Sequence, residues 1–193
     1  MKIVYIHGAN ATSDSFNYIR NYIKGYDEVA LEYDSRDGFY NNLEYLEKKM
    51  RRIKDAFFVC HSLGGIYALY LTDRFPSKVI GAVTISTPYG GAEAADYAKY
   101  FLPFSKLLQD IGTNSRPIKT ANTISVQHPW TQIVTTQGNS PWINEPNDGV
   151  VTIKSMKHRQ DVEQIEIESN HYEIVINPTC VNLIKNKIKG VNV

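Results

Sequence analysis

Short apolar runs rich in Val and Ile alternate with amphipathic stretches along most of the chain. The runs predict six strands, at Lys2–His7, Glu28–Asp34, Ala56–Cys60, Val79–Ser86, Thr131–Thr136 and Val162–Glu168. The amphipathic stretches predict helices at Ser13–Lys24, Tyr40–Ile53, Leu63–Phe75 and Pro178–Ile188. Strands that alternate with helices form βαβ units, so we expect an α/β protein whose mostly parallel sheet is covered by helices on both faces.

Two stretches interrupt this alternation. Residues 137–149 are rich in Gly, Pro and Asn, which indicates an ordered loop with several turns. Residues 87–123 are long and mixed, with an apolar cluster at Phe101, Leu102, Phe104, Leu107, Leu108 and Ile111. Long excursions inside a compact domain are often lids or binding loops. We therefore expect one domain over residues 1–193, in which residues 92–122 form a short cap.

Composition and charge narrow the class of protein. Hydrophobic residues make up 42% of the 193 residues and charged residues 21%, which is typical of a globular domain. The net charge of +1 gives no reason to expect a nucleic-acid partner. The first apolar run is too short for a signal peptide, and no run approaches a membrane span, so we expect a cytoplasmic protein without integral membrane association. The two cysteines are unpatterned and suggest neither a disulfide nor a zinc site.

Ser62 stands where an apolar strand runs directly into a helix. This strand–turn–helix context is the one in which a nucleophilic serine sits on a sharp, strained turn. Such a turn requires small residues two positions away on either side, and Gly64 and Cys60 occupy those positions. We expect Cys60 to be a small buried filler. The alternative is that Ser62 is an ordinary N-cap of the helix.

The sequence resembles the α/β-hydrolase superfamily, and within it the small bacterial lipases and esterases. The segments that carry the resemblance are residues 3–9, 60–65, 86–91, 147–151 and 170–173. In that order, they resemble the strand and His-Gly turn of an oxyanion hole, the nucleophile elbow, a Thr-Pro-x-x-Gly turn, and the loops of the catalytic acid and histidine. The resemblance implies a minimal α/β-hydrolase fold with a six-stranded sheet and a serine nucleophile.

The base that accompanies the serine is expected late in the chain. In this fold the order is Ser, then the acid, then His, which leaves only His158 and His171. His171 follows the last predicted strand, so it lies at the same carboxyl edge of the sheet as Ser62. His158 lies between two basic residues, so we expect it to be a solvated surface residue. We therefore predict His171 as the base.

Asp148 is the predicted acid. It lies in the loop after the fifth strand, and Gly149 beside it lets the backbone turn so that the carboxylate faces inward. Glu145 is the only nearby rival. An Asx-turn carboxylate without a catalytic role is the other reading of the Asn-Asp-Gly sequence.

The oxyanion hole is expected to consist of two backbone N–H groups, those of Ala9 and Leu63. The amide of Asn10 is a further possible donor, whereas His7 is expected to pack beneath the turn. For the substrate we predict an apolar wall formed by Phe101, Leu102, Phe104 and Leu107. The alternative is that this segment packs on the sheet as an ordinary helix.

These residues together predict a serine esterase or small lipase that acts through an acyl-enzyme intermediate. Its partner would be a small-molecule ester with an apolar acyl group, and no cofactor is expected. A thioesterase or amidase would use the same residues, and a non-catalytic binding protein on this scaffold is a third reading. Glu173 falls where some related lipases have a calcium ligand, but no matching carboxylate precedes it, so no metal is predicted.

Overall fold

A six-stranded sheet forms the centre of the computed structural model, which describes residues 1–96, 104–140 and 143–191. In chain order the strands are β1 (Lys2–Ile6), β2 (Asp27–Ala30), β3 (Ala56–His61), β4 (Val79–Ile85), β5 (Trp130–Thr135) and β6 (Glu163–Ile167). They lie side by side in the order β2-β1-β3-β4-β5-β6, and each neighbouring pair is parallel. The α/β class and the six-stranded parallel sheet predicted from the sequence are confirmed.

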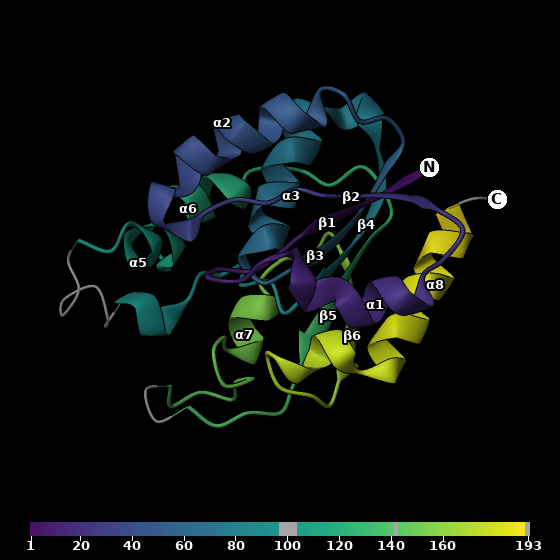
Figure 1. The fold of residues 1–193 in the computed structure, drawn as a ribbon. Coiled ribbons are helices and arrows are strands. Elements are labelled where there is room, and N and C mark those ends of the chain that lie inside the picture. The colour runs from purple at the N-terminus through teal and green to yellow at the C-terminus, as the bar shows by residue number, and fades with distance from the viewer. Residues whose placement is uncertain (97–103, 141–142, 192–193) are drawn as a thin grey trace.

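Helices cover both faces of the sheet (Figure 1). One face carries α2 (Phe39–Met50), α3 (Leu63–Arg74) and α6 (Arg116–Ala121), and the other carries α1 (Asn17–Tyr22) and α8 (Pro178–Val191). Along β3, Phe58 and Cys60 point into the core under α2 and α3, whereas Phe57 and Val59 point into the core under α1 and α8. Because both faces are buried at the centre of the sheet, β1, β3 and β4 are mostly apolar, whereas the edge strands β2 and β6 carry exposed polar residues.

Two predicted elements differ from the structure near the N-terminus. The helix expected at Ser13–Lys24 is a 3₁₀ turn, η1 (Ser13–Phe16), followed by α1, since the short polar side chains at its start favour turns over a helix interior. The second strand ends at Ala30, well before the predicted Asp34. Its only neighbour, β1, ends at Ile6, so the chain beyond Leu31 has no strand to pair with.

The excursion between β4 and β5 contains α5 (Lys106–Ile111) and α6, and residues 97–103 within it lie outside the described residues. Its described part is tied to the rest of the molecule by hydrogen bonds. The N–H of Phe39 on α2 donates to the Asp110 carboxylate at 2.8 Å, and the Tyr70 hydroxyl on α3 donates to the carbonyl of Pro117 at 2.9 Å. As a result, α5 lies beside the end of the sheet where the strands finish (Figure 1).

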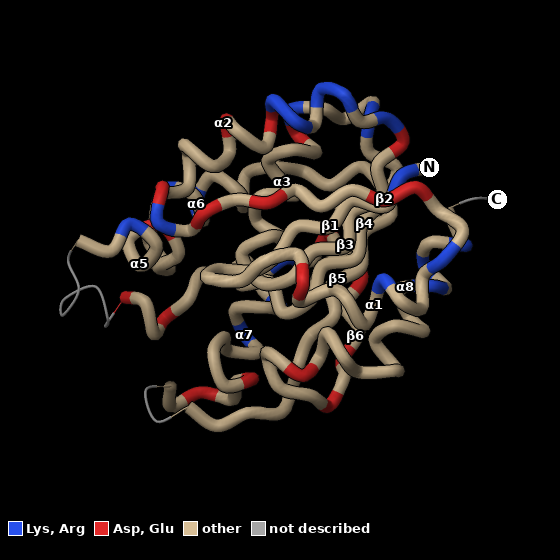
Figure 2. Tube along the Cα trace, in the orientation of Figure 1, with Lys and Arg blue, Asp and Glu red and all other residues tan. Residues whose placement is uncertain are grey.

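Positive charges gather at the opposite end of the molecule, around the C-terminal end of α2 (Figure 2). The residues are Lys48, Lys49, Arg51 and Arg52, and the nearby Lys78 donates to the carbonyls of Arg51 and Ile53. Cations at this position stabilise the negative end of the helix dipole, so the cluster has a structural explanation. None of the helices in the described ranges combines the length and apolar composition needed to cross a membrane.

Candidate active site

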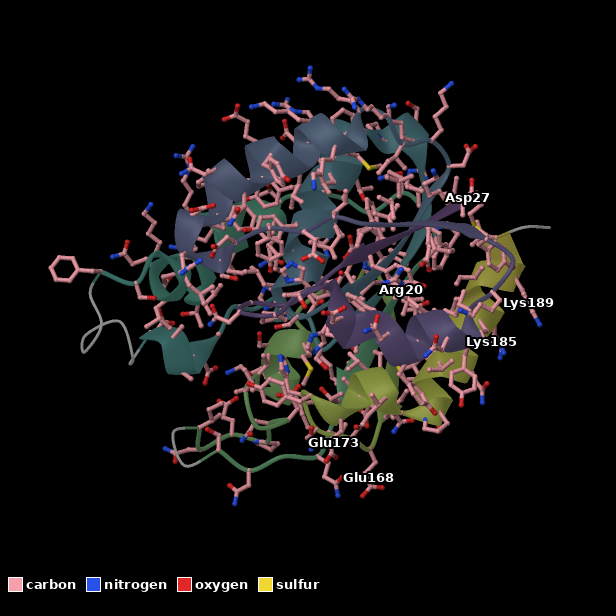
Figure 3. All side chains as sticks on the ribbon, in the orientation of Figure 1. Arg20, Asp27, Glu168, Glu173, Lys185 and Lys189 are labelled. Carbon is pink, nitrogen blue, oxygen red and sulfur yellow. The ribbon has the colours of Figure 1, made fainter. Side chains whose placement is uncertain are left out.

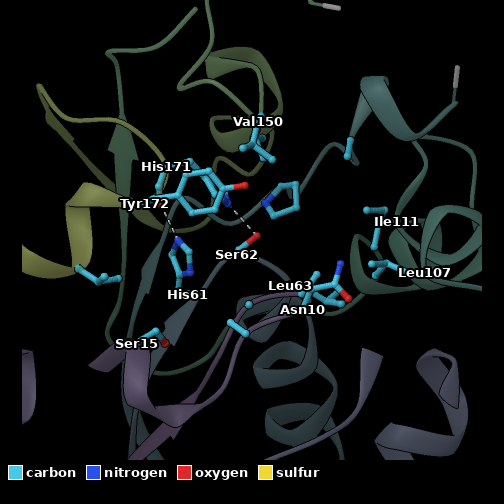
Figure 4. A pocket seen from close by; sticks show the side chains of 17 residues that line it. Asn10, Ser15, His61, Ser62, Leu63, Leu107, Ile111, Val150, His171 and Tyr172 are labelled. Carbon is cyan, nitrogen blue, oxygen red and sulfur yellow. Dashed lines mark hydrogen bonds between the residues drawn. The ribbon is translucent and has the colours of Figure 1, made fainter. Parts of the chain in front are cut away.

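Three polar residues that are far apart in the sequence meet where β3, β5 and β6 end. The Oγ of Ser62 lies 3.1 Å from Nε2 of His171 (Figure 4), and Nδ1 of His171 lies 2.7 Å from Oδ2 of Asp148. All three residues are less than 10% exposed, at 8%, 3% and 0% respectively. The structure therefore joins the three residues predicted as nucleophile, base and acid in one hydrogen-bonded chain.

Ser62 sits on a strained turn between β3 and α3. Its φ of 52° and ψ of −124° are unusual for a residue with a side chain, and such a conformation costs on the order of 1–3 kcal/mol. The turn is held by two backbone hydrogen bonds, from Ser62 N–H to Ile85 O and from Gly65 N–H to Ser62 O. The Ser62 side chain makes no capping bond to α3. Its hydroxyl is instead directed to His171.

The residues two positions from Ser62 on either side are small, and at Gly64 the reason is that the turn presses against the end of β1. A Cβ added to Gly64 would lie 2.1 Å from the Ile6 carbonyl oxygen, which leaves no room for a side chain. Cys60 is fully buried in the core under α2 and α3. Burial raises the pKa of its thiol well above the ordinary value, so the sulfur stays protonated.

Asp148 is held by four donors. Oδ1 accepts from the N–H groups of Val150 and Val151 at 3.0 and 2.8 Å, and Oδ2 accepts from His171 and from Thr135 Oγ1 at 2.5 Å. Burial alone would raise the pKa of this carboxyl, but the hydrogen bonds and the His171 charge outweigh it and hold the pKa below its ordinary value. Asp148 therefore forms an Asx turn through Oδ1 and also contacts His171 through Oδ2.

Glu145, the rival acid, lies elsewhere. Its carboxylate pairs with Lys154 at 3.4 Å on the outside of the same loop. His158, the rival base, is exposed, and neither residue is among those that contact Ser62 or His171 in the described part of the chain.

His171 is fixed by its backbone as well as its ring. Its N–H donates to the Asp148 carbonyl at 3.0 Å, and its own carbonyl accepts a hydrogen bond from Nε2 of His61 at 2.9 Å (Figure 4). Burial, reinforced by the neighbouring His171, lowers the pKa of His61 to about 3, so this ring is neutral with its proton on Nε2. Chain order set His61 aside as the base, but it did not reveal this contact with the His171 backbone. Its position next to Ser62 was the only signal in the sequence.

The two predicted oxyanion donors border the same space. Ala9 and Leu63 line the cavity beside Ser62, and no backbone partner is recorded for either N–H within the described ranges. The N–H of Asn10 is already used, since it donates to Ser35 Oγ at 2.9 Å. His7 packs beneath the turn as expected, with its ring stacked on Tyr33 at 4.3 Å.

The cavity above Ser62 has a volume of about 280 Å³. Among the described residues its lining contains no Lys, Arg, Asp or Glu, and its apolar part includes Ala92, Leu107, Ile111, Val150 and Val175. The described part of the cavity wall therefore carries no acidic side chain and no Lys or Arg, and it is partly apolar.

Only part of the predicted apolar wall is found there. Leu107 lines the cavity, whereas Phe104 is 95% exposed and points away from it, which corrects the prediction for that residue. Phe104 precedes α5 and its N-cap Ser105, so it does not share the inward face of that helix. Phe101 and Leu102 lie outside the described residues.

No cluster of three or more His, Cys, Asp or Glu side chains that could hold a metal ion occurs among the residues with described positions. Glu173, at the position of a calcium ligand in some lipases, is exposed at the start of η4 (Glu173–Ile176; Figure 3).

No protein-family model matches the chain, and no curated protein does so either. Among solved structures, the mature form of Bacillus licheniformis lipase BlEst2 is 18% identical, with a TM-score of 0.77 over 96% of this chain and 91% of that chain. An alpha/beta superfamily hydrolase from Oenococcus oeni PSU-1 is 14% identical, with a TM-score of 0.69 over 100% and 93%. The Vlm2 thioesterase domain is also 14% identical, with a TM-score of 0.61 over 96% and 94%. The chain has the α/β-hydrolase fold.

Replacing Gly64 by Ala tests the close approach at the turn. Because the new Cβ would meet backbone atoms of β1, which cannot move aside, we expect Gly64→Ala to lower the free energy of unfolding by roughly 1–3 kcal/mol. The matched control is Gly190→Ala near the end of α8, where nothing lies within 4 Å and a change within about 0.5 kcal/mol is expected. Urea unfolding measures both changes, and a Gly64→Ala protein as stable as the wild type would contradict the packing described.

Thiol reactivity tests the burial of both cysteines. Burial raises the pKa of the Cys180 thiol to about 12 and also raises that of Cys60 well above the ordinary value, so neither forms the reactive thiolate at neutral pH. We expect Ellman's reagent to modify no thiol in the folded protein and two per chain in denaturant. Rapid modification of Cys60 in the folded protein would show that the region beneath the turn at Ser62 is accessible to solvent.

Proposed function

We propose that this protein is a serine hydrolase that cleaves carboxylic esters through an acyl-enzyme intermediate. In this proposal Ser62 is the nucleophile, His171 the general base and Asp148 the residue that orients and stabilises the base. The observation that supports it most is the hydrogen-bonded chain from Ser62 through His171 to Asp148, reached by a serine whose backbone is strained. A serine that served only as an N-cap would bond to its own helix, and this one does not.

The first half of the reaction follows from these contacts. Ser62 Oγ attacks the ester carbonyl while its proton passes to Nε2 of His171. The imidazolium that forms is stabilised by the Asp148 carboxylate on Nδ1. Negative charge develops on the former carbonyl oxygen, where the N–H groups of Ala9 and Leu63 are suited to receive it. The C–O bond to the alcohol then breaks, and the alcohol leaves with the proton held by His171.

The second half repeats these roles with water. His171, neutral again, removes a proton from a water molecule that attacks the acyl-enzyme carbonyl. The same N–H groups receive the second oxyanion, and Ser62 is released when His171 returns the proton to Oγ. No cofactor is required for either half.

The cavity indicates the acyl group. Its volume and uncharged lining favour a small apolar acyl chain, and we propose that α5 closes one side of it through Leu107 and Ile111. The structural likeness to a lipase supports ester hydrolysis, and the likeness to a thioesterase domain supports thioester cleavage by the same residues as the second candidate. A purely binding role would give no reason for the strained Ser62.

Active-site labelling tests the nucleophile. We expect a fluorophosphonate probe to label Ser62 and no other serine, and Ser62→Ala to lose both the label and hydrolysis of p-nitrophenyl esters. Loss of a triad residue lowers turnover by roughly 10⁴–10⁶-fold in serine hydrolases. Labelling of a different serine, or turnover that survives Ser62→Ala, would exclude this mechanism.

The histidines provide a matched pair for the base. His171→Ala should lower turnover nearly as far as Ser62→Ala, because the hydroxyl then has no proton acceptor. His158→Ala should leave kcat within about twofold, because that side chain is exposed and away from the site. The reverse pattern in steady-state kinetics would show that the base has been misassigned.

The apolar wall is tested by comparing Leu107 with Phe104. Leu107→Ala removes part of the cavity lining, so KM for a butyrate or hexanoate ester should rise by roughly tenfold, the equivalent of about 1.4 kcal/mol of lost contact. Phe104→Ala is the control, and its KM should not change, since that ring is in solvent. Equal effects of the two variants would show that the cavity described is not the acyl site.

A further inference from the structure

Two buried hydroxyl groups stand in line behind Asp148. Oγ1 of Thr135, at the end of β5, lies 2.5 Å from Oδ2 of Asp148, and Oγ of Ser86, just after β4, lies 2.8 Å from the Thr135 hydroxyl. Ser86 and Thr135 are both 0% exposed. The chemistry proposed above uses neither residue.

The direction of these hydrogen bonds follows from counting protons. An ionised carboxylate only accepts, so Thr135 must give its single hydroxyl proton to Asp148. Its oxygen can then only accept from Ser86, which is therefore the donor of the second bond. The Met156 sulfur, 3.4 Å from the Thr135 oxygen, is left as a packing contact. The result is a directed relay from Ser86 to Thr135 to Asp148.

The backbone of Ser86 indicates that this placement is enforced. Ser86 has a φ of 51°, a conformation that costs a residue with a side chain on the order of 1–3 kcal/mol. Its N–H donates to the Ile133 carbonyl at 2.9 Å, which ties the residue to β5 beside Thr135. Of the four non-glycine residues with positive φ in the described ranges, Ser86, Ser62 and Asn10 all lie at or next to this site.

We propose that Ser86 and Thr135 are a positioning pair that aims Oδ2 of Asp148 at His171 and shares its negative charge. This inference rests on the proposed function of the site. Oδ2 is the oxygen that also accepts from Nδ1 of His171, so the hydroxyl and the imidazole compete for the same charge. The relay therefore weakens the attraction between Asp148 and the imidazolium form of His171. The neutral imidazole, which is the active form, is favoured down to a lower pH.

The other titratable groups around His171 should not mask the effect of the Thr135 hydroxyl on its protonation. Within the described ranges, the titratable side chains that contact its ring are Asp148, His61 and Tyr172, of which His61 is neutral because burial lowers its pKa to about 3. Glu173, two residues further on, is exposed. Water cannot replace a lost hydroxyl easily, because Asp148 is itself fully buried. Removing the Thr135 hydroxyl should therefore strengthen the pull of Asp148 on the imidazolium.

The test is the pH profile of kcat/KM for a p-nitrophenyl ester in the wild type, Thr135→Val, Thr135→Ser and Ser86→Ala. We expect the acidic limb of Thr135→Val to move to higher pH by roughly half to one pH unit, because only part of the roughly one to two units that a hydrogen bond to a charged group represents is passed on from Asp148 to His171. Ser86→Ala should move it less in the same direction. Thr135→Ser, which keeps the hydroxyl, should restore the wild-type limb.

A limb that stays in place in Thr135→Val, or that moves equally in Thr135→Ser, would overturn the proposal and leave the hydroxyls a packing role. Should Thr135→Val fail to fold, the shift in Ser86→Ala decides the question. NMR titration of the His171 ring, identified among the five histidines by the His171→Ala spectrum, measures proton uptake without turnover. Absence of hydrolysis and of Ser62 labelling in the wild type would defeat the proposed function, whereas an unchanged NMR midpoint in the variants would defeat the relay.

Discussion

The turn at Ser62 is the constraint on which the rest of the site depends. A residue with a side chain is held at a φ of 52° between β3 and α3, and the turn fits only because Gly64 has no side chain where it meets the Ile6 carbonyl. In that conformation the hydroxyl leaves its own helix uncapped and reaches His171. The same geometry leaves the N–H of Leu63 at the start of a helix, where negative charge is stabilised.

The other loops are aligned with this turn by a parallel sheet and by bonds between the loops themselves. All strands finish at one edge, so the residues after β3, β5 and β6 are neighbours there (Figure 1). The Asp148 carbonyl accepts from the His171 N–H, and His61 holds the His171 carbonyl. A shift of any one loop would therefore disturb the other two. We infer that these hydrogen bonds between the loops, more than the shape of the cavity, keep the three side chains within hydrogen-bonding distance of one another.

Some features of the site could be predicted from the sequence, and others could not, for physical reasons. Strand–turn–helix context and chain order were enough to single out Ser62, Asp148 and His171, because those signals are local or fixed by topology. The contact between the Thr135 and Ser86 hydroxyls could not be predicted, because it depends on the register of β4 and β5, and no local sequence pattern determines that register. The helix predicted from Ser13 begins with a 3₁₀ turn because its first residues are short and polar. Phe104 was predicted to face the cavity but faces solvent, because an apolar residue in an irregular segment belongs to no periodic pattern that fixes its direction.

The most direct test of the account is to trap the acyl-enzyme. The wild type would be mixed with a p-nitrophenyl ester, quenched in acid within milliseconds, digested with trypsin and sequenced by mass spectrometry. Cleavage after Lys54 and Arg74 releases residues 55–74 as one peptide that contains both Ser62 and Cys60, so fragment ions distinguish the two. We expect the mass of the acyl group on Ser62. Acyl mass on Cys60, or hydrolysis that proceeds with no covalent adduct on this peptide, would contradict it.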